Sequence, residues 1–444
     1  MLDRAAGYSQ SAKKTISIIQ GITLLIYILL RVFTTLSAIA APRELADTDI
    51  YLRISKESIF GTNFFAVKRP FVFPFLLQLV HQDFTAAAVI QLSLSILAWG
   101  LLALVVSGSL RPAWLKFAAF VVILALSLVR HLAGWDFVMM TESLSLSTFV
   151  FFIAAGTWLM RGWRTYKVIA FCATAFFFAF TRDTNAYLLA MFAGLLLIAV
   201  LFRWATPKAL IISGFFVMVF YLSNLSADTS QRWVFPLVNV IGKRILPYTA
   251  SNQNLAACGM PITPKLLSLA DTFANGQDRA FFNDPELEGF RVWVSEHGKP
   301  CYARWLLNDP VKRTVEVFSE FDGLIYFEDI TWYFSRRYSD LLPSRLERIL
   351  YPVYYVTWLW AGLTVAALIA VVKRAWRGNV LWAVFIMLCL TIFPHLFINW
   401  HGDAMAPERH AISVGLQLSV SFWLFIFLIL ERLHFYLLKD AANP

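Results

Sequence analysis

The stretch APRELADTDIYLRISKESIFGTNFFAVKRPFVFP, residues 41–74, interrupts the hydrophobic sequence of this 444-residue chain just after its first long apolar run. The polar and ionisable side chains that set it apart are Asp47, Asp49, Tyr51, Lys68 and Arg69. A plain connection between two membrane spans needs no such concentration of acids and bases. This loop is therefore the starting point for interpreting the rest of the chain.

The beginning of the loop is predicted to form a short helix at the membrane interface, because Ile50, Ile54 and Ile59 can share one helical face. Asp47 would lie at the N-terminal end of that helix. There Asp47 or Thr48 could act only as a helix cap, or Asp47 could carry chemistry. A second helix is expected to follow the basic pair and to lean back into the bilayer, so that the first loop contains a helix pair.

Composition places the chain among membrane proteins. Hydrophobic residues make up 59% of it and charged residues only 15%, with a mean hydropathy of +0.64, far outside the range of soluble proteins. The net charge of +10 does not indicate nucleic-acid binding, because much of the basic excess falls in short loops, where it sets topology. The first apolar run is long and follows several basic residues, so we interpret it as a signal anchor.

Ten apolar runs are long enough to cross a hydrocarbon layer of about 30 Å. They lie near residues 15–40, 84–108, 113–130, 140–160, 166–181, 185–203, 207–225, 349–372, 378–399 and 411–437. The predicted fold class is therefore an all-α polytopic membrane protein with about ten transmembrane helices. Two of the runs are short, so nine or eleven spans also fit the sequence.

Basic residues concentrate in alternate loops, which predicts that both termini are cytoplasmic. The residues that carry this pattern are Arg4, Lys13, Lys14, Arg111, Lys116, Arg161, Arg164, Lys167, Arg203, Lys208, Lys373, Arg374, Arg377, Arg432 and Lys439. The opposite loops contain the acids and histidines that topology does not explain, in residues 41–83, 131–142, 182–183, 226–348 and 401–410. These clusters would all lie on the exoplasmic side.

Charged residues at span ends are costly unless they line a wet cavity or pair with one another. The residues in question are Arg31, Glu142, Arg182, Asp183 and His395. Each one alone could be a topological or snorkelling charge. Together they predict a shared polar cavity at the exoplasmic surface.

Residues 226–348 are predicted to form a mostly helical exoplasmic domain between a membrane module at 1–225 and C-terminal membrane helices at 349–444. Its amphipathic stretches lie at 264–275, 286–296, 302–307 and 311–321. Cys258 and Cys301 both fall in this domain, and outside the cytoplasm they could form a disulfide; two free thiols are the alternative. No P-loop, CxxC or HExxH motif is present in the sequence.

Several short motifs resemble the GT-C superfamily of membrane glycosyltransferases. The first loop has Asp-x-x-x-Tyr at Asp47–Tyr51, then Gly61, then Arg-Pro-x-x-x-Pro at 69–74. Looser matches are Thr-Glu-Ser at 141–143, Arg-Asp at 182–183 and Glu-Arg-His at 408–410. Within the superfamily, the chain looks most like the bacterial branch that contains the lipid A aminoarabinose transferase and the protein O-mannosyltransferases.

The resemblance implies a module of about seven conserved spans, an exoplasmic active site, and a sugar donor carried on polyprenyl phosphate. It also implies a location in the bacterial inner membrane. In such enzymes an aspartate of the first loop is the general base, and Asp47 matches it through its spacing to Tyr51. Asp49 lies two residues further on, whereas the mannosyltransferase pattern usually has adjacent acids. Which of Asp47 and Asp49 is catalytic stays open at this point.

The chemistry of such a transfer assigns roles to the remaining polar residues. Inverting transfer to a hydroxyl needs a carboxylate base, and cations must stabilise the departing lipid phosphate, for which arginine is well suited. The candidate phosphate ligands are Lys68, Arg69, Arg182 and Arg409. The candidate substrate-orienting residues are Tyr51, Glu142, Asp183, His401 and His410. The acceptor could be a glycan, a lipid or a protein, and no nucleic-acid partner is expected.

A metal cofactor is not required if these cations neutralise the phosphate. Asp47, Asp49 and Glu142 could nevertheless hold a Mg²⁺ or Mn²⁺ ion through oxygen ligands. We therefore expect no metal, with a divalent ion as the alternative.

Two other functions compete with this interpretation. A polymerase or ligase of the O-antigen type would use basic residues of the large loop, here Arg232, Lys243, Arg244, Arg336 and Arg337; the paired acids of the first loop argue against it. A flippase or other transporter would place charges deep within its spans, but here the charges gather at the span ends.

Overall fold

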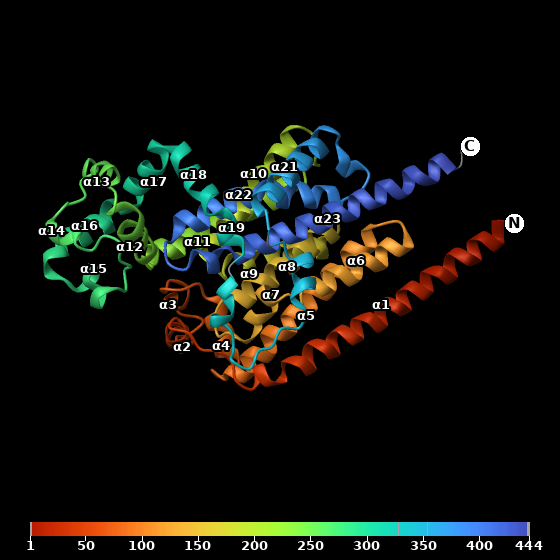
Figure 1. The fold of residues 1–444 in the computed structure, drawn as a ribbon, viewed down its shortest axis with the longest axis horizontal. Helices are drawn as coiled ribbons and strands as arrows, with labels where there is room; N and C mark the ends of the chain where they lie inside the picture. The colour runs from red at the N-terminus through yellow and green to blue at the C-terminus, as the bar shows by residue number, and fades with distance from the viewer. Residues whose placement is uncertain (1, 327, 353, 442–444) are drawn as a thin grey trace.

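The computed structural model describes residues 2–441 except 327 and 353. Within that part of the chain the structure is helical, and the only β-type pairing is an isolated bridge between Arg43 and Val138. Four side chains of the predicted basic pattern lie outside the described ones: Arg4, Lys13, Lys14 and Lys439. Figure 1 shows the long helices as one bundle, with both chain ends at the end of the molecule opposite α13–α17.

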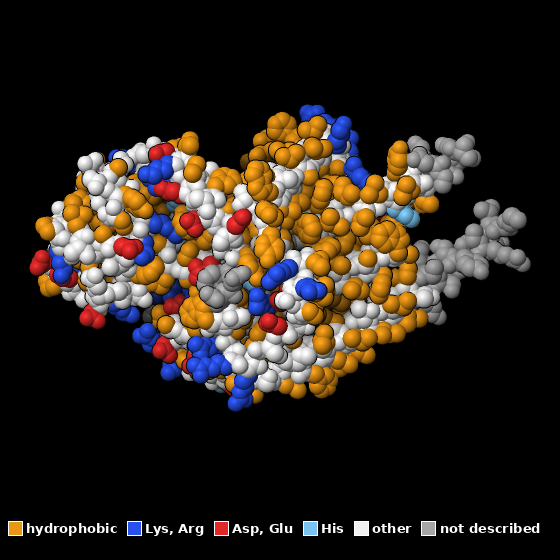
Figure 2. All heavy atoms as spheres, viewed as in Figure 1, with side chains coloured by type: hydrophobic (Ala, Val, Ile, Leu, Met, Phe, Trp, Pro, Cys, Tyr) orange, Lys and Arg blue, Asp and Glu red, His pale blue; other side chains and the backbone are white. Residues whose placement is uncertain are grey.

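Seven helices of the described chain are long and apolar enough to cross a membrane. They are α1 (Leu2–Ile39), α5 (Phe84–Ser109), α8 (Glu142–Met160), α10 (Asp183–Leu201), α11 (Ala209–Thr229), α22 (Leu381–Gly402) and α23 (Pro407–Ala441). Figure 2 shows mostly hydrophobic side chains over the helical bundle, whereas charged side chains gather over α12–α17 and the first loop. The chain thus has the architecture of a helical membrane protein.

The number of spans differs from the ten predicted. Each predicted run coincides with an apolar helix, but α9 (Thr165–Ala179) and α21 (Val356–Val372) are shorter than the rest. Helix α6 (Ala113–Leu126) is followed, after a bend of 57°, by α7 (Arg130–Ala133) and η1 (Gly134–Phe137). These helices are long enough for a span only when they are counted together as one bent span. At 1.5 Å per residue α6 is about 21 Å long, which is too short to cross alone. The described helices therefore provide seven spans by length, or eight with the bent pair.

The first loop contains the predicted helix pair. Helix α2 (Thr48–Ile54) begins directly after Asp47, and α4 (Val72–Leu79) follows the basic pair, with the short α3 (Thr62–Phe65) between them. The Thr48 hydroxyl is buried, accepts a hydrogen bond from the Leu45 amide at 3.0 Å and donates to the Met139 carbonyl at 3.1 Å. The carboxylate of Asp47 makes no capping hydrogen bond, so helix capping does not explain it.

A small unit, residues 234–308, has a hydrophobic core of its own, which includes Phe290, Trp293 and Trp305. Its helices are α12 (Val234–Val240), η2 (Ile241–Ile245), α13 (Thr249–Ala256), α14 (Pro264–Leu267), η3 (Gln277–Arg279), α15 (Ala280–Asn283), η4 (Pro285–Leu287), α16 (Glu288–Trp293), η5 (Val294–Gly298) and α17 (Lys299–Asn308). Cys258 and Cys301 form a disulfide that joins the loop after α13 to α17.

The predicted domain at 226–348 is larger than this unit. After α17 the chain returns to the membrane helices, where Val317, Phe321 and Ile325 join their hydrophobic core. The elements of this return are α18 (Pro310–Ser319), α19 (Phe321–Ile325), η6 (Glu328–Tyr333) and α20 (Ser344–Leu350), and η7 (Ala375–Arg377) follows α21. The helix predicted over 264–275 is also too long: only its first turn is helical, and tight turns follow.

A buried ion pair holds the first membrane helix to the bundle. The guanidinium of Arg31 pairs with Asp136 and also donates to Ser95 Oγ at 3.2 Å and to the Ser127 carbonyl at 3.4 Å. Asp136 accepts a further hydrogen bond from Ser143 Oγ at 2.6 Å. The sequence predicts that Arg31 contributes to a shared polar cavity, and this is wrong: the Arg31 side chain is buried inside the helix bundle and pairs there with Asp136.

Candidate functional site

A cavity of about 500 Å³ lies where α8, α10, α22 and α23 meet the first loop and the small unit. One part of its lining is polar and contains Tyr51, Arg69, Glu142, Arg182, Arg409 and His410. Another part is apolar and contains Leu237, Ala303, Leu306, Phe397 and Ile398. The lining of the cavity thus combines charged and hydrophobic side chains, and its walls come from segments far apart in sequence.

Glu142 is at the centre of the charged part. Its side chain is 2% exposed, and its Oε1 lies 3.2 Å from Arg409 Nε and 3.7 Å from Arg182 Nη1. The two arginines are connected as well, since Arg182 Nη1 donates to the Arg409 carbonyl at 3.3 Å. The N-terminus of α8 thus supplies the carboxylate, while the arginines come from the ends of α10 and α23.

The carboxylate of Asp47 extends this cluster into the first loop. Its Oδ1 accepts a hydrogen bond from Arg69 Nη2 at 2.6 Å, and its Oδ2 lies 3.5 Å from Arg409 Nη2. The Asp47 side chain is 21% exposed and is not itself in the cavity lining, whereas both of these arginines are. Arg409 therefore bridges two carboxylates, one from the loop and one from α8.

Burial and neighbouring charges shift the pKa of three side chains in this cluster. Burial raises the pKa of the Tyr51 phenol, so this group stays protonated and can donate. Burial opposes the charge of Arg69, but Tyr51 and Asp47 raise the pKa of its guanidinium above the ordinary value. Burial lowers the pKa of Arg182, and Glu142 works against that shift. Arginine stays protonated in both cases, so the cluster keeps its positive charges.

His410 is held between an arginine and an acid. Arg182 Nη2 donates to His410 Nδ1, so the ring is neutral with its proton on Nε2, and Nε2 lies 3.8 Å from Asp403 Oδ2. Asp403 is tied to the small unit, because Asn239 Nδ2 donates to its Oδ1 at 2.9 Å. Burial raises the pKa of Asp403. The sequence did not single out Asp403, which connects the small unit to the charged part of the cavity.

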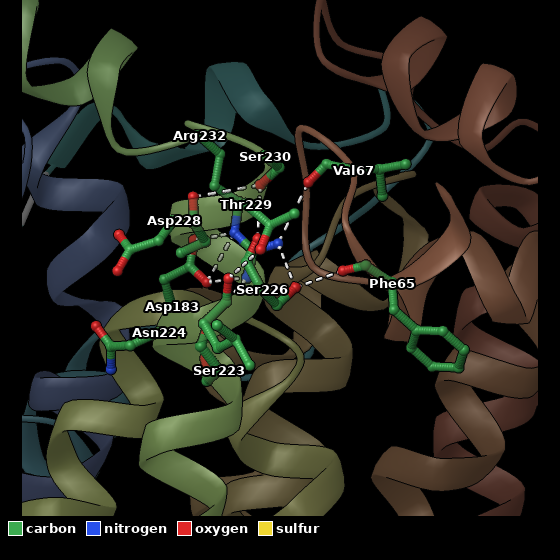
Figure 3. Close-up of polar contacts among 12 residues, drawn as sticks. Phe65, Val67, Asp183, Ser223, Asn224, Ser226, Asp228, Thr229, Ser230 and Arg232 are labelled. Atoms are coloured by element: carbon green, nitrogen blue, oxygen red, sulfur yellow. Dashed lines mark hydrogen bonds and ion pairs between the residues drawn. The ribbon is translucent and has the colours of Figure 1, made fainter. Parts of the chain in front are cut away.

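Arg232 fastens the first loop to the membrane helices, as Figure 3 shows. Its side chain is 4% exposed and binds the Asp183 carboxylate through Nε at 2.9 Å and Nη2 at 2.8 Å. Its Nη1 donates to the Val67 carbonyl at 3.2 Å and to Ser226 Oγ at 3.1 Å, and Ser226 Oγ donates in turn to the Phe65 carbonyl. Asp183, predicted to orient substrate, lines the cavity and also binds Arg232.

We expect Arg232→Gln to loosen the segment at residues 62–70. Amide exchange there should become about tenfold to hundredfold faster, since hydrogen bonds to a charged group stabilise by about 1.5–3 kcal/mol. Hydrogen–deuterium exchange read by mass spectrometry measures this directly. Lys243→Gln is the control, because Lys243 pairs with the 78% exposed Asp271 and not with the loop. Equal exchange in both variants would contradict the anchoring role.

The other predicted residues occupy different positions. Lys68 lines the cavity, is exposed, and makes no hydrogen bond or ion pair with the described part of the chain. His401 also lines the cavity, with its Nε2 donating to the Arg313 carbonyl at 3.2 Å. Asp49 is exposed and outside the lining. His395 is buried against Gln417, with 3.0 Å between Nδ1 and Oε1, and does not line the cavity.

The acids considered as metal ligands do not converge. Among the described residues, no group of three or more His, Cys, Asp or Glu side chains is placed to hold a metal ion. Asp47 and Glu142 each lie within ion-pairing distance of arginines, and the exposed Asp49 does not line the cavity. The site is thus built from arginine–carboxylate contacts.

Sequence reasoning also missed Asn399, which is 1% exposed and lines the cavity from the C-terminal turn of α22. A single asparagine at the end of an apolar run gives little signal by itself.

Comparisons of the chain with protein-family models, with curated proteins and with solved structures found no significant match.

Proposed function

We propose that this chain is an inverting membrane glycosyltransferase that moves a sugar from a polyprenyl-phosphate donor to an acceptor at the exoplasmic face of the membrane. The observation that carries the proposal is one cavity whose lining combines a cluster of arginines with apolar side chains. A lipid-linked sugar phosphate needs both, because its phosphate requires cations while its tail requires a hydrophobic surface.

The cations suit the phosphate of such a donor. Arg69, Arg182 and Arg409 line the cavity, and Lys68 lines it without a partner among the described residues. Guanidinium groups bind phosphate oxygens bidentately, and in a buried setting they stabilise charge that grows on a leaving group. We therefore assign the donor phosphate to these four residues.

The apolar part suits the beginning of the lipid. Ala303 and Leu306 of α17 face the cavity together with Phe397 and Ile398 of α22, a helix long and apolar enough to span the membrane. A lipid that arrives from the bilayer would reach the cavity along such a helix. This arrangement favours a lipid-delivered donor over a nucleotide sugar.

Asp47 is the proposed general base. In the transfer, the acceptor hydroxyl gives its proton to the Asp47 carboxylate while its oxygen forms a bond to the anomeric carbon. The bond between that carbon and the phosphate oxygen breaks on the opposite face, so the configuration inverts, and the lipid phosphate leaves with the electron pair. The Asp47 carboxylate is 21% exposed, and its contact at 2.6 Å with Arg69, an arginine of the cavity lining, keeps it next to the cavity.

The proposed orientation places both termini in the cytoplasm and the cavity outside, in a bacterial inner membrane. The chain ends and the disulfide-bonded unit lie at opposite ends of the helical bundle (Figure 1), and disulfides persist in oxidising compartments. These two features support the orientation.

Transfer from a panel of radiolabelled polyprenyl-phosphate sugars tests the proposal. Membranes containing the chain are incubated with each donor and with cell-envelope glycans, lipids and proteins as acceptors. We expect one donor to be consumed, and Arg69→Ala to reduce its consumption by about 10²-fold. Lys243→Ala is the matched control, since Lys243 is a cation of the small unit outside the cavity lining. If no donor is consumed, the proposed function is wrong.

The polymerase or ligase alternative depends on basic residues of the large loop. Of these, Arg232 does line the cavity. Its guanidinium is already bound to Asp183, to Ser226 and to the backbone of the first loop. The other four, Lys243, Arg244, Arg336 and Arg337, are not in the cavity lining, which favours the glycosyltransferase with a first-loop base.

A further inference from the structure

Two buried polar side chains of the cavity lack the hydrogen bonds that burial demands. The amide of Asn399 is 1% exposed, and neither its Nδ2 nor its Oδ1 has a hydrogen-bond partner in the described part of the protein. The two oxygens of Glu142 also lack a hydrogen bond there, although Arg409 and Arg182 lie within ion-pairing distance. Buried polar groups in native proteins are almost always paired, so both residues point to a ligand.

The chemistry of these groups identifies the kind of ligand. An asparagine amide offers two donors and an acceptor, whereas an ionised carboxylate only accepts. A phosphate has acceptors alone, so it cannot satisfy Glu142 and would be repelled by it. A hydroxyl group both donates and accepts, and several adjacent hydroxyls would satisfy Asn399 and Glu142 together.

The position of the pair agrees with this chemistry. Glu142 begins α8, Asn399 lies in the last turn of α22, and these two helices are in contact. Glu142 also lies 3.2 Å from Arg409, one of the proposed phosphate ligands. A group recognised by Glu142 and Asn399 would therefore adjoin the phosphate, as a sugar esterified to that phosphate must.

We infer that Asn399 and Glu142 recognise the hydroxyl groups of the transferred sugar. Asn399 then determines specificity, because it favours binding of the sugar-carrying lipid phosphate over the same lipid phosphate without the sugar. This inference rests on the proposed function. It divides the cavity into a cationic part for the phosphate, a hydroxyl-binding part for the sugar and an apolar part for the lipid.

Binding to two lipids tests the inference without turnover. The full chain is reconstituted in lipid nanodiscs, and equilibrium binding is measured for polyprenyl phosphate and for the polyprenyl-phosphate sugar that the donor panel selects. We expect Asn399→Ala to weaken binding of the sugar lipid by about tenfold to hundredfold, because a site built for hydroxyls is left unpaired. Binding of polyprenyl phosphate itself should not change. Arg69→Ala should weaken binding of both lipids.

Asn224→Ala is the matched control. Asn224 is another asparagine of the lining, but its amide is already satisfied, since it accepts from the Tyr187 hydroxyl at 3.0 Å and donates to the Phe220 carbonyl at 2.9 Å. Asn399→Leu is a second variant of nearly the same shape that loses the donors and the acceptor without introducing a charge, in case the alanine variant does not fold. It should show the same selective loss, with an unfolding temperature close to that of the wild type.

The outcomes separate the two proposals. If the Asn399 variants bind the sugar lipid as the wild type does, water satisfies the amide and the inference is overturned. An equal loss for both lipids also overturns it, because Asn399 would then belong to the phosphate site or to the fold. If the wild type binds neither lipid, the proposed function itself fails, and this inference fails with it.

Discussion

Replacing Asp47 by asparagine should lower sugar transfer by about 10²–10⁴-fold, the usual contribution of a positioned general base. The substitution keeps the shape of the side chain but removes the carboxylate that would accept the proton. Asp49→Asn should leave transfer unchanged, because the exposed Asp49 carboxylate makes no ion pair with the described residues, whereas Asp47 pairs with Arg69 and Arg409 of the cavity lining. Initial rates of transfer from the donor identified by the panel measure both effects.

Two further measurements make this comparison decisive. Binding of the sugar lipid to Asp47→Asn should persist, since the cavity keeps Arg69, Arg182 and Arg409, and thermal unfolding checks that the variant is folded. Full activity of Asp47→Asn combined with loss of activity in Glu142→Gln would instead identify Glu142 as the base. Loss of activity in Asp49→Asn with Asp47→Asn active would reverse the proposed roles of the two aspartates.

The first loop shows what the sequence could predict. The spacing of apolar residues after Asp47 predicts a short helix, and α2 begins directly after Asp47. Helical periodicity is a local property of the sequence, so it can be recognised without knowledge of the rest of the chain. The same holds for the apolar runs, each of which coincides with a helix. Whether a run crosses the membrane depends on where its helix ends and where it bends, as the chain does after α6. The sequence gives only a weak signal for such ends and bends.

The partners of the charged residues could not be predicted in the same way. Arg31 and Arg182 both occur near span ends in the sequence, yet Arg31 is neutralised by Asp136 inside the bundle and Arg182 lines the cavity. Asp183 is adjacent to Arg182 but points to Arg232, which is 49 residues away in the chain. Such contacts depend on how the helices pack and rotate, and sequence spacing carries no information about them.

Replacing Arg31 by leucine is the second change for which we expect a large effect, here on stability. Arg31 is 0% exposed and Asp136 is 2% exposed, so the substitution leaves a buried carboxylate that keeps the hydrogen bond from Ser143 but has lost its counter-charge. Removing one partner of a buried pair destabilises by about 3–5 kcal/mol. The free energy of unfolding in detergent, measured by denaturant titration against an exposed-arginine control such as Arg374→Leu, should show this loss.

The double variant Arg31→Leu with Asp136→Leu separates an unpaired charge from lost packing. If the cost of the single change comes from the isolated carboxylate, removing that carboxylate as well should recover much of the stability, because an apolar pair pays no desolvation penalty. Additive losses in the double variant would instead mean that the hydrogen bonds to Ser95 and the Ser127 carbonyl stabilise the bundle independently of the ion pair. Sugar-lipid binding should survive in the double variant, since neither residue lines the cavity. The pair would then be purely architectural, holding α1 against the helices that carry the site.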